Sequence, residues 1–159
     1  MNSEIEAREI TFEILRPEEG VGFLIDLFGP NNMSRGEKLV VGELANNFEN
    51  FIYYGVSVLD RIYVNLASWH LYRLSNGGGY MAPINSTILN IDNHDFGSSC
   101  LSSDAAGLFA TLCALRQLEI ESEESQKSSF IDQQNKLCDF ISQHIEGKFI
   151  LELFNQKDF

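Results

Sequence analysis

The segment LSSDAAGLFATLCALRQLEI, residues 101–120, places the tightest constraint on how this chain can fold. Residues 105–115 are apolar on nearly every side of a helix, so this helix has no face suited to water. Ser102 or Ser103 can cap its first turn by accepting a backbone N–H, and Asp104 adds favourable negative charge there. A helix that is apolar all round lies at the centre of its domain, so the other elements must surround it.

A second segment, LSNGGGYMAP at residues 74–83, stands between two stretches rich in aromatic and apolar residues. Asn-Gly in this setting is a hairpin signal, because glycine adopts a positive φ without steric cost. The pattern predicts two antiparallel strands, Trp69–Leu74 and Gly79–Ala82, with the hairpin at 74–80. A phosphate-binding loop is not favoured, because it requires spaced glycines, a following lysine and a helix, and Pro83 interrupts any helix here.

Shorter strands are predicted near the start and the middle of the chain. Residues 1–15 contain a candidate edge strand, because three apolar residues alternate with polar ones: Ile10, Phe12 and Ile14. A third strand of the sheet is suggested by Ile88, Leu89 and Ile91. Residues 51–66 mix β-branched and aromatic types with Gly, Asp and Asn, so they could form a helix, a strand or one of each.

Apolar periodicity predicts three more helices, at residues 17–28, 39–48 and about 125–146. The last has one apolar face, formed by Phe130, Leu137, Cys138, Ile141 and Ile145. Gly147 is its candidate C-cap, and residues 147–159 form a short tail without an assigned conformation. These elements predict an α+β fold, with a small antiparallel sheet of three to four strands packed against about four helices. We expect a single compact domain over residues 1–159.

The charge of the chain bears on its partners. With 23 acidic and 11 basic residues, the formal net charge is −12, and no basic stripe is present. Nucleic-acid binding requires such a stripe to displace counterions, so we expect no direct DNA binding. An acidic surface can instead attract a basic protein face or imitate the phosphates of DNA, and it also confers solubility.

The chain has the composition of a folded cytoplasmic protein. No apolar run reaches the length of a membrane helix, and the acidic start does not resemble a secretory signal. We therefore expect no membrane association and a cytoplasmic location. The three cysteines form no CxxC pair and are expected to be buried, reduced thiols: Cys100, Cys113 and Cys138.

Residues that could carry chemistry are scattered. Asp92, His94 and Asp95 lie together in IDNHDFGSS, but a metal site requires more ligands, and an Asx-rich turn explains them. His70 falls in a predicted strand, and no nucleophile, zinc or dinucleotide motif is present. The sequence thus predicts no catalytic residue, no metal and no cofactor. A small enzyme that uses His70 and the Asp92, His94 and Asp95 cluster stays as an alternative.

Several stretches resemble one known family when taken together. They are FLIDLFGP (23–30), RGEKLVVGELANNF (35–48), WHLYRLSNGGGYMAP (69–83), LSSDAAGLFATLCAL (101–115) and LCDFISQH (137–144). Their order and approximate spacing resemble the ArdB/KlcA antirestriction proteins of plasmids and other mobile elements. The resemblance covers about residues 20–146, and its most specific motifs are LSNGG with MAP and the later LSxDAAG helix start. The chain departs from the family at Gly79, where an aromatic residue is usual, and at residues 49–66, a segment that is longer and more aromatic than usual.

The resemblance implies a small mixed α/β fold that protects unmodified DNA from Type I restriction, and it supplies no active site. Its partner would be the Type I restriction-modification complex, reached directly or indirectly. The turn at residues 76–78 would position the aromatic residues of the hairpin, and Gly79 would loosen it locally. Candidate interaction or motif positions are Trp69, Tyr72, Ser75, Asn76, Gly77, Gly78, Tyr80 and Asp104.

The mechanism has three alternatives at this stage. We favour a non-catalytic and indirect effect on the restriction complex. The second alternative is an acidic DNA mimic, which requires carboxylates spaced like phosphates along an extended surface. This chain places its acids at the N-terminus, at residues 119–124 as the exposed end of a helix, and sparsely elsewhere. The third alternative is the small enzyme named above.

Overall fold

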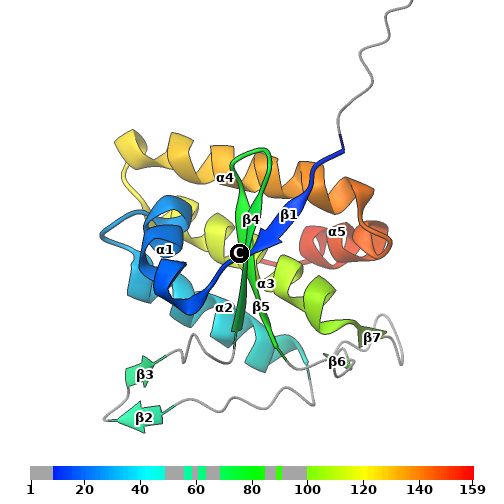
Figure 1. The fold of residues 1–159 in the computed structure, drawn as a ribbon, viewed down its shortest axis with the longest axis horizontal. Helices are drawn as coiled ribbons and strands as arrows, with labels where there is room; N and C mark the ends of the chain where they lie inside the picture. The colour runs from blue at the N-terminus through cyan, green and yellow to red at the C-terminus, as the bar shows by residue number, and fades with distance from the viewer. Residues whose placement is uncertain (1–8, 49–55, 59–60, 64–68, 85–88, 91–99) are drawn as a thin grey trace, which may run out of the picture.

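The computed structural model describes residues 9–48, 56–58, 61–63, 69–84, 89–90 and 100–159. Helix α3, Ser103–Glu121, lies in the middle of these elements, as the sequence predicts (Figure 1). The Ser102 hydroxyl caps it by accepting the N–H of Ala105 at 3.1 Å. Residues 105–115 of this helix are all buried, so they form the centre of one cluster of apolar side chains.

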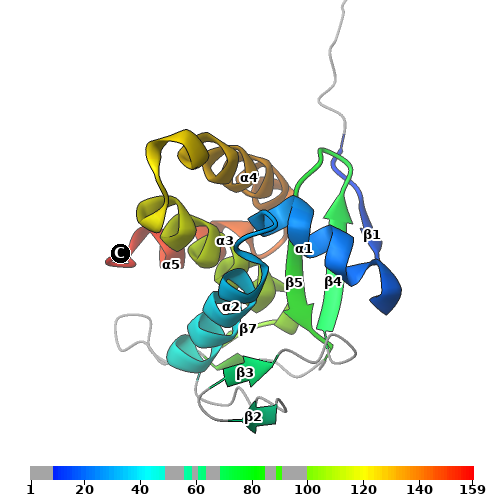
Figure 2. The same ribbon diagram turned by 90° about the vertical axis from the view of Figure 1, so that its left-hand side faces the viewer.

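Three helices and one strand pack around α3. They are α2 (Met33–Asn47), α4 (Glu124–Gln143), α5 (Gly147–Asn155) and β5 (Gly79–Pro83). Figure 2 shows the sheet on one side of α3 and the helices α2, α4 and α5 around its other sides. The predicted α+β class, with a small antiparallel sheet and a few helices, is therefore confirmed.

The main sheet has the strand order β1-β4-β5, and both pairings are antiparallel. Strand β4, Trp69–Leu74, is central, and it pairs with β5 through the predicted hairpin. Strand β1, Phe12–Ile14, pairs with β4 and forms an outer edge, which confirms the predicted edge strand. Strand β5 instead lies against α3, where the Thr111 hydroxyl accepts the N–H of Met81 at 3.2 Å.

The hairpin turn depends on two residues. Gly77 has a φ of +90°, which only glycine adopts readily, and its N–H donates to the Leu74 carbonyl at 3.0 Å. The Asn76 side chain accepts the N–H of Gly78 at 3.0 Å and donates to the Lys136 carbonyl of α4 at 2.9 Å. The turn is therefore fixed both by its own backbone and by helix α4.

The prediction that Gly79 loosens the hairpin is wrong. A Cβ at this position would lie 2.6 Å from Cε2 of Phe23 and 3.0 Å from the Tyr72 carbonyl oxygen. The missing side chain lets the Phe23 ring of helix α1, Gly20–Phe28, pack directly on the strand. Gly79 therefore permits close packing at this point of the sheet.

Two helices begin elsewhere than their apolar pattern suggests. The predicted helix 17–28 is a 3-10 turn, Pro17–Glu19, followed by α1. Helix α2 begins at Met33, six residues before the predicted start at 39. Met33 is the one apolar residue among residues 33–38, so the apolar stripe that predicts the helix starts later. The Gly36 N–H already donates to the Asn32 carbonyl at 2.7 Å, so the helical hydrogen bonds start there.

The predicted C-terminal region requires two corrections. Helix α4 ends at Gln143, and Gly147 is the first residue of α5, not a C-cap. The assumed tail thus contains a helix, whose buried side chains include Ile150 and Leu153. Ile145 does not belong to the apolar face of α4, because it lies in the turn between the helices and is 96% exposed.

Two short strand pairs lie outside the main sheet. Strand β2 (Val56–Val58) pairs with β3 (Arg61–Tyr63), and β6 (Leu89–Asn90) pairs with β7 (Cys100–Leu101). The predicted third strand is therefore present at Leu89, but it pairs with β7 and not with the hairpin. Its other two positions, Ile88 and Ile91, lie outside the described residues.

All three cysteines are free, but only Cys113 is fully buried. The expectation of buried thiols is wrong for Cys100, which is exposed on β7, and Cys138 is partly buried. Within the described part of the chain, no helix combines the length and the apolar character needed to cross a membrane.

Candidate functional site

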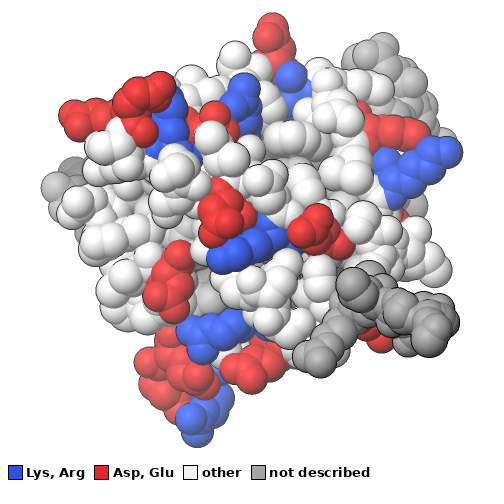
Figure 3. Space-filling view, turned by 90° about the horizontal axis from the view of Figure 1, so that it is seen from above, with Lys and Arg blue, Asp and Glu red and all other residues white. Residues whose placement is uncertain are grey.

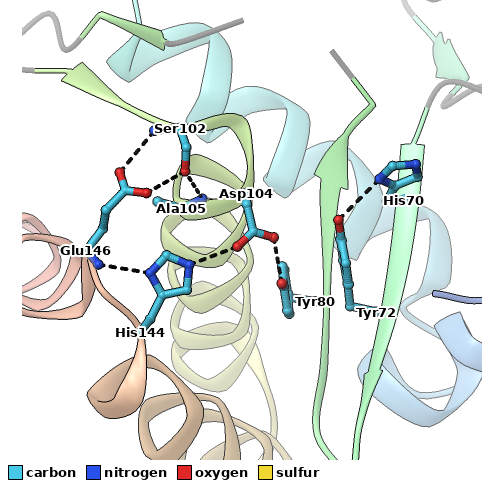
Figure 4. Close-up of polar contacts among 8 residues, drawn as sticks. All are labelled: His70, Tyr72, Tyr80, Ser102, Asp104, Ala105, His144 and Glu146. Atoms are coloured by element: carbon cyan, nitrogen blue, oxygen red, sulfur yellow. Dashed lines mark hydrogen bonds and ion pairs between the residues drawn. The ribbon is translucent and has the colours of Figure 1, made fainter. Parts of the chain in front are cut away.

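A polar network connects the sheet to the ends of three helices (Figure 4). Its centre is Asp104, in the first turn of α3. The Tyr80 hydroxyl of β5 donates to Oδ1 of Asp104 at 2.6 Å, and Nε2 of His144 lies 2.9 Å from Oδ2. Both carboxylate oxygens therefore have a partner from another element.

The backbone fixes the protonation pattern of His144. The N–H of Glu146 donates to Nδ1 of the ring at 3.0 Å, so Nδ1 carries no hydrogen. In the neutral ring the hydrogen is then on Nε2, which donates to Asp104. Because both ring nitrogens are engaged within the protein, neither is free to accept a proton from a bound molecule.

Glu146 connects the starts of two helices. Its carboxylate accepts the backbone N–H of Ser102 at 3.0 Å and the Ser102 hydroxyl at 2.6 Å. The same hydroxyl caps α3, and Glu146 itself immediately precedes α5. This serine is thus occupied as a helix cap, and the charged hydrogen bonds hold α3 and α5 together.

The network also determines two protonation states. Burial raises the pKa of Asp104, but the hydrogen bonds from His144 and Tyr80 outweigh burial and lower this pKa below its usual value. Burial, followed by the hydrogen bond to Asp104, raises the pKa of Tyr80 far above its usual value. At neutral pH Asp104 is therefore charged and Tyr80 is protonated.

Aromatic rings cover the network on the sheet. Tyr72 stacks on Tyr80 with ring centroids 4.5 Å apart and an interplanar angle of 6°. The Tyr72 hydroxyl lies 3.2 Å from Nδ1 of His70, and both rings project from the same face of β4 (Figure 4). Phe140 of α4 lies 5.8 Å from Tyr80, centroid to centroid, so it also packs against that ring.

Comparisons with known proteins identify the family. Residues 64–155 match the family described as "Antirestriction protein". A protein named antirestriction protein KlcA, from Escherichia coli, is 39% identical over 133 residues, which are 80% of this chain and 82% of that protein. This chain belongs to the antirestriction protein family. A second antirestriction protein KlcA from the same species is 35% identical over 144 residues, covering 89% of this chain and 92% of the relative.

The fold of this antirestriction protein is also shared with a solved structure. The match has a TM-score of 0.73 and 34% identity, and it covers 97% of this chain and 99% of the other. That structure belongs to a study of the KlcA and ArdB proteins, which are described as a novel fold. The same description gives them antirestriction activity against Type I DNA restriction systems in vivo but not in vitro.

The candidate positions of the antirestriction motifs fall into two groups. Tyr72, Tyr80 and Asp104 come together in the network. The others hold the hairpin or fill the core: Trp69 is buried, and the Ser75 hydroxyl accepts the N–H of Thr11 at 2.9 Å. The remaining hairpin positions, Asn76, Gly77 and Gly78, form the turn that contacts Lys136.

Sequence reasoning missed two members of the network, His144 and Glu146. They flank Ile145, which is exposed in the short segment between two amphipathic helices. Two polar residues between two helical patterns are a local signal of a turn, but they do not show which residues the turn contacts. Across the described ranges, no group of three or more potential ligands is placed to hold a metal ion. Asp92, His94 and Asp95 lie outside the described residues, so that cluster stays a sequence hypothesis.

Proposed function

We propose that this chain relieves Type I restriction of unmodified DNA that enters the cell. Membership of the antirestriction family supports the proposal. The observation that carries it is the activity described for the solved KlcA and ArdB proteins, which share the fold of this chain over nearly its whole length. The chain would act in the cytoplasm and be encoded by a plasmid or another mobile element.

We further propose that the relief is non-catalytic and indirect. Activity in vivo but not in vitro, as described for the solved relatives, favours an effect that requires cellular components. The polar network supports the absence of chemistry, because His144 uses both ring nitrogens and Ser102 is occupied as a helix cap.

We assign a structural role to the motif positions. Asp104 and Tyr80 hold the start of α3 on the sheet, and Tyr72 stacks on that pair. The hairpin residues fix the turn on α4. These positions would support the active surface without forming it: Trp69, Tyr72, Ser75, Asn76, Gly77, Gly78, Tyr80 and Asp104.

An acidic DNA mimic receives less support from the distribution of charge. On the face that carries α4, basic side chains lie among the acidic ones, so the acids form no continuous ridge there (Figure 3). Glu121 pairs with Arg35 at 2.6 Å. Glu119 accepts from Arg116 and Gln134, both at 2.8 Å, and its side chain is only 15% exposed, so its expected solvated position is wrong.

The proposal is tested by plating unmodified phage on a host with a Type I system, with the chain expressed or replaced by an empty vector. We expect the chain to raise the plating efficiency towards that of an isogenic host without the system. Modified phage serves as the control, because its plating should not change. Equal efficiencies of unmodified phage with and without the chain would overturn the proposal.

The enzyme alternative is tested with a variant in which His70, Asp92, His94 and Asp95 are all changed to Ala. If relief is non-catalytic, a folded variant keeps its protection in the same plating assay. Circular dichroism provides the folding control. Loss of protection in a folded variant would instead favour the enzyme.

A further inference from the structure

The outer edge of strand β1 has open backbone hydrogen-bonding groups. Leu15 donates its N–H to the Leu71 carbonyl, and Thr11 accepts the N–H of Ser75 through its carbonyl, both at 2.9 Å. Backbone groups alternate in direction along a strand, so the odd-numbered residues of β1 face β4. The N–H and C=O groups of Phe12 and Ile14 therefore face outward, where Figure 2 shows β1 as the last strand of the sheet.

Ile10, which lies earlier on the same edge, already has a partner that takes the place of a neighbouring strand. Ile10 donates its N–H to Oε1 of Gln143 at 3.0 Å and accepts from Nε2 of Gln143 at 2.6 Å. The side-chain amide thus satisfies both outward groups of Ile10, as a neighbouring strand would. Among the residues that the structure describes, none does the same for Phe12 or Ile14.

Exposed apolar side chains lie beside this open edge. Phe12 is 54% and Ile14 51% exposed, although Phe12 also packs edge-on against Tyr72, with ring centroids 5.4 Å apart. A hollow of about 390 Å³ adjoins Phe12, between β1 and the end of α4, and the fully exposed Ile145 forms part of its wall. An open strand edge with exposed apolar side chains and a neighbouring hollow is suited to pairing with another chain.

Charge indicates which kind of chain fits this edge. Glu13 lies between Phe12 and Ile14, is exposed, and makes no ion pair with any described residue. Two copies of β1 paired antiparallel through their outward groups would place Glu13 directly opposite its own copy, and like charges in that position are destabilising. A segment with a basic residue at that position would be attracted instead, by Glu13 and by the net charge of −12.

We propose that the outer edge of β1 binds an extended segment of a partner protein, in which a Lys or Arg stands between two apolar residues. The backbone of the segment pairs with Phe12 and Ile14. Its apolar side chains lie against those of Phe12 and Ile14, and its basic side chain lies opposite Glu13. This inference concerns binding alone and does not depend on the proposed relief of restriction.

The test uses the full chain labelled with ¹⁵N and two blocked peptides, STIKVTS and STIEVTS, which differ only in the central charge. We expect the lysine peptide to shift the amide signals of Phe12 and Ile14 in a saturable way. Its affinity should exceed that of the glutamate peptide at least threefold. Equal affinities, or no response of these two amides, would overturn the proposal.

Variants of the edge distinguish backbone pairing from non-specific hydrophobic binding. Ile14→Pro removes an outward N–H while the hydrogen bonds to β4, which come from odd-numbered residues, are kept. We expect it to weaken binding of the lysine peptide at least tenfold, whereas Ile14→Thr, which keeps the N–H, weakens it less. Glu13→Gln should reduce the preference for lysine over glutamate to the part that the net charge of the chain supplies. Unchanged amide signals in α3 show that each variant is folded, and if Ile14→Pro is not, the charge preference and its change in Glu13→Gln carry the test.

A second copy of the chain is the competing occupant. Sedimentation of the unlabelled chain should show a monomer at the concentrations used for the titration. A dimer that Ile14→Pro dissociates would assign the edge to self-association and overturn the proposal. Binding of the lysine peptide without relief of restriction in cells would leave this inference intact and count only against the proposed function.

Discussion

At the scale of single residues, Gly107 determines how closely α3 approaches the sheet. A Cβ there would overlap Ala82 and lie 2.6 Å from the Met81 carbonyl oxygen, and backbone cannot move aside as a flexible side chain can. We predict that Gly107→Ala lowers the free energy of unfolding by about 1–3 kcal/mol. The matched control is Gly42→Ala in α2, where no atom lies within 4 Å of the added carbon. There the higher helix propensity of Ala should raise the free energy of unfolding by about 0.5–1 kcal/mol. Urea unfolding measures both, and equal effects would contradict the close packing.

Asp104 gives the second residue-scale prediction, which concerns pH. Its folded pKa is lowered, so its contribution to stability is present above the unfolded pKa of about 4 and is lost as the pH falls towards the folded pKa. Asp104→Asn should reduce the free energy of unfolding by on the order of 1 kcal/mol at pH 7, because the amide offers a donor where His144 already donates. The difference from the unchanged chain should shrink below about pH 4. Urea midpoints from pH 7 to 3.5 check this, and a difference that grows on acidification would contradict the sign.

Single residues of the network were only partly predictable. The cap at Ser102 and the charge at Asp104 follow from local rules about the first turn of a helix, and both are where the sequence places them. The contact of Asp104 with His144 joins residues 40 positions apart. It depends on where α4 ends and how the chain turns into α5, which no local pattern specifies.

At the scale of elements, the Asn76 side chain hydrogen-bonds the hairpin turn to α4. Replacing it with Ala removes its bonds to the Gly78 N–H and the Lys136 carbonyl and should lower the free energy of unfolding by about 1–2 kcal/mol. Asn46→Ala is the control, because Asn46 is exposed on α2 and Ala is the better helix former. Amide hydrogen exchange at Gly78 should speed up only in the Asn76 variant. Unchanged exchange and stability would contradict a structural role for the turn.

Elements with strong periodic signals were predicted well, and those without them were not. Helix α3 and the strands of the hairpin match their predicted ranges within about two residues, because apolar runs and a glycine turn mark them. The start of helix α2 was predicted too late, because its first turn holds a single apolar residue, Met33, and shows no apolar stripe. Helix α5 was missed because Gly147 resembles a C-cap, whereas here it begins a helix whose first turn lies against the Ile141 carbonyl.

At the scale of the whole molecule, most of the basic side chains that the structure describes form ion pairs with acidic ones. Among the described residues, six Lys and Arg side chains have an acidic partner within 4 Å: Arg16, Arg35, Arg73, Arg116, Lys136 and Lys157. Such pairs leave few free cations for DNA phosphates, and they interrupt the acidic surface that a DNA mimic needs. We propose that residues 1–159 form one antirestriction domain around the shared core and that its partner in the cell is a protein.

The most direct test of this account is the rate at which a purified Type I enzyme cleaves unmodified DNA in the presence of the purified chain. The same gene, expressed in cells, must restore the plating of unmodified phage, which shows that the chain is active. An indirect and non-catalytic mechanism predicts an unchanged cleavage rate, even with the chain in molar excess. Inhibition that saturates near one chain per enzyme complex would contradict the account and would establish a direct inhibitor.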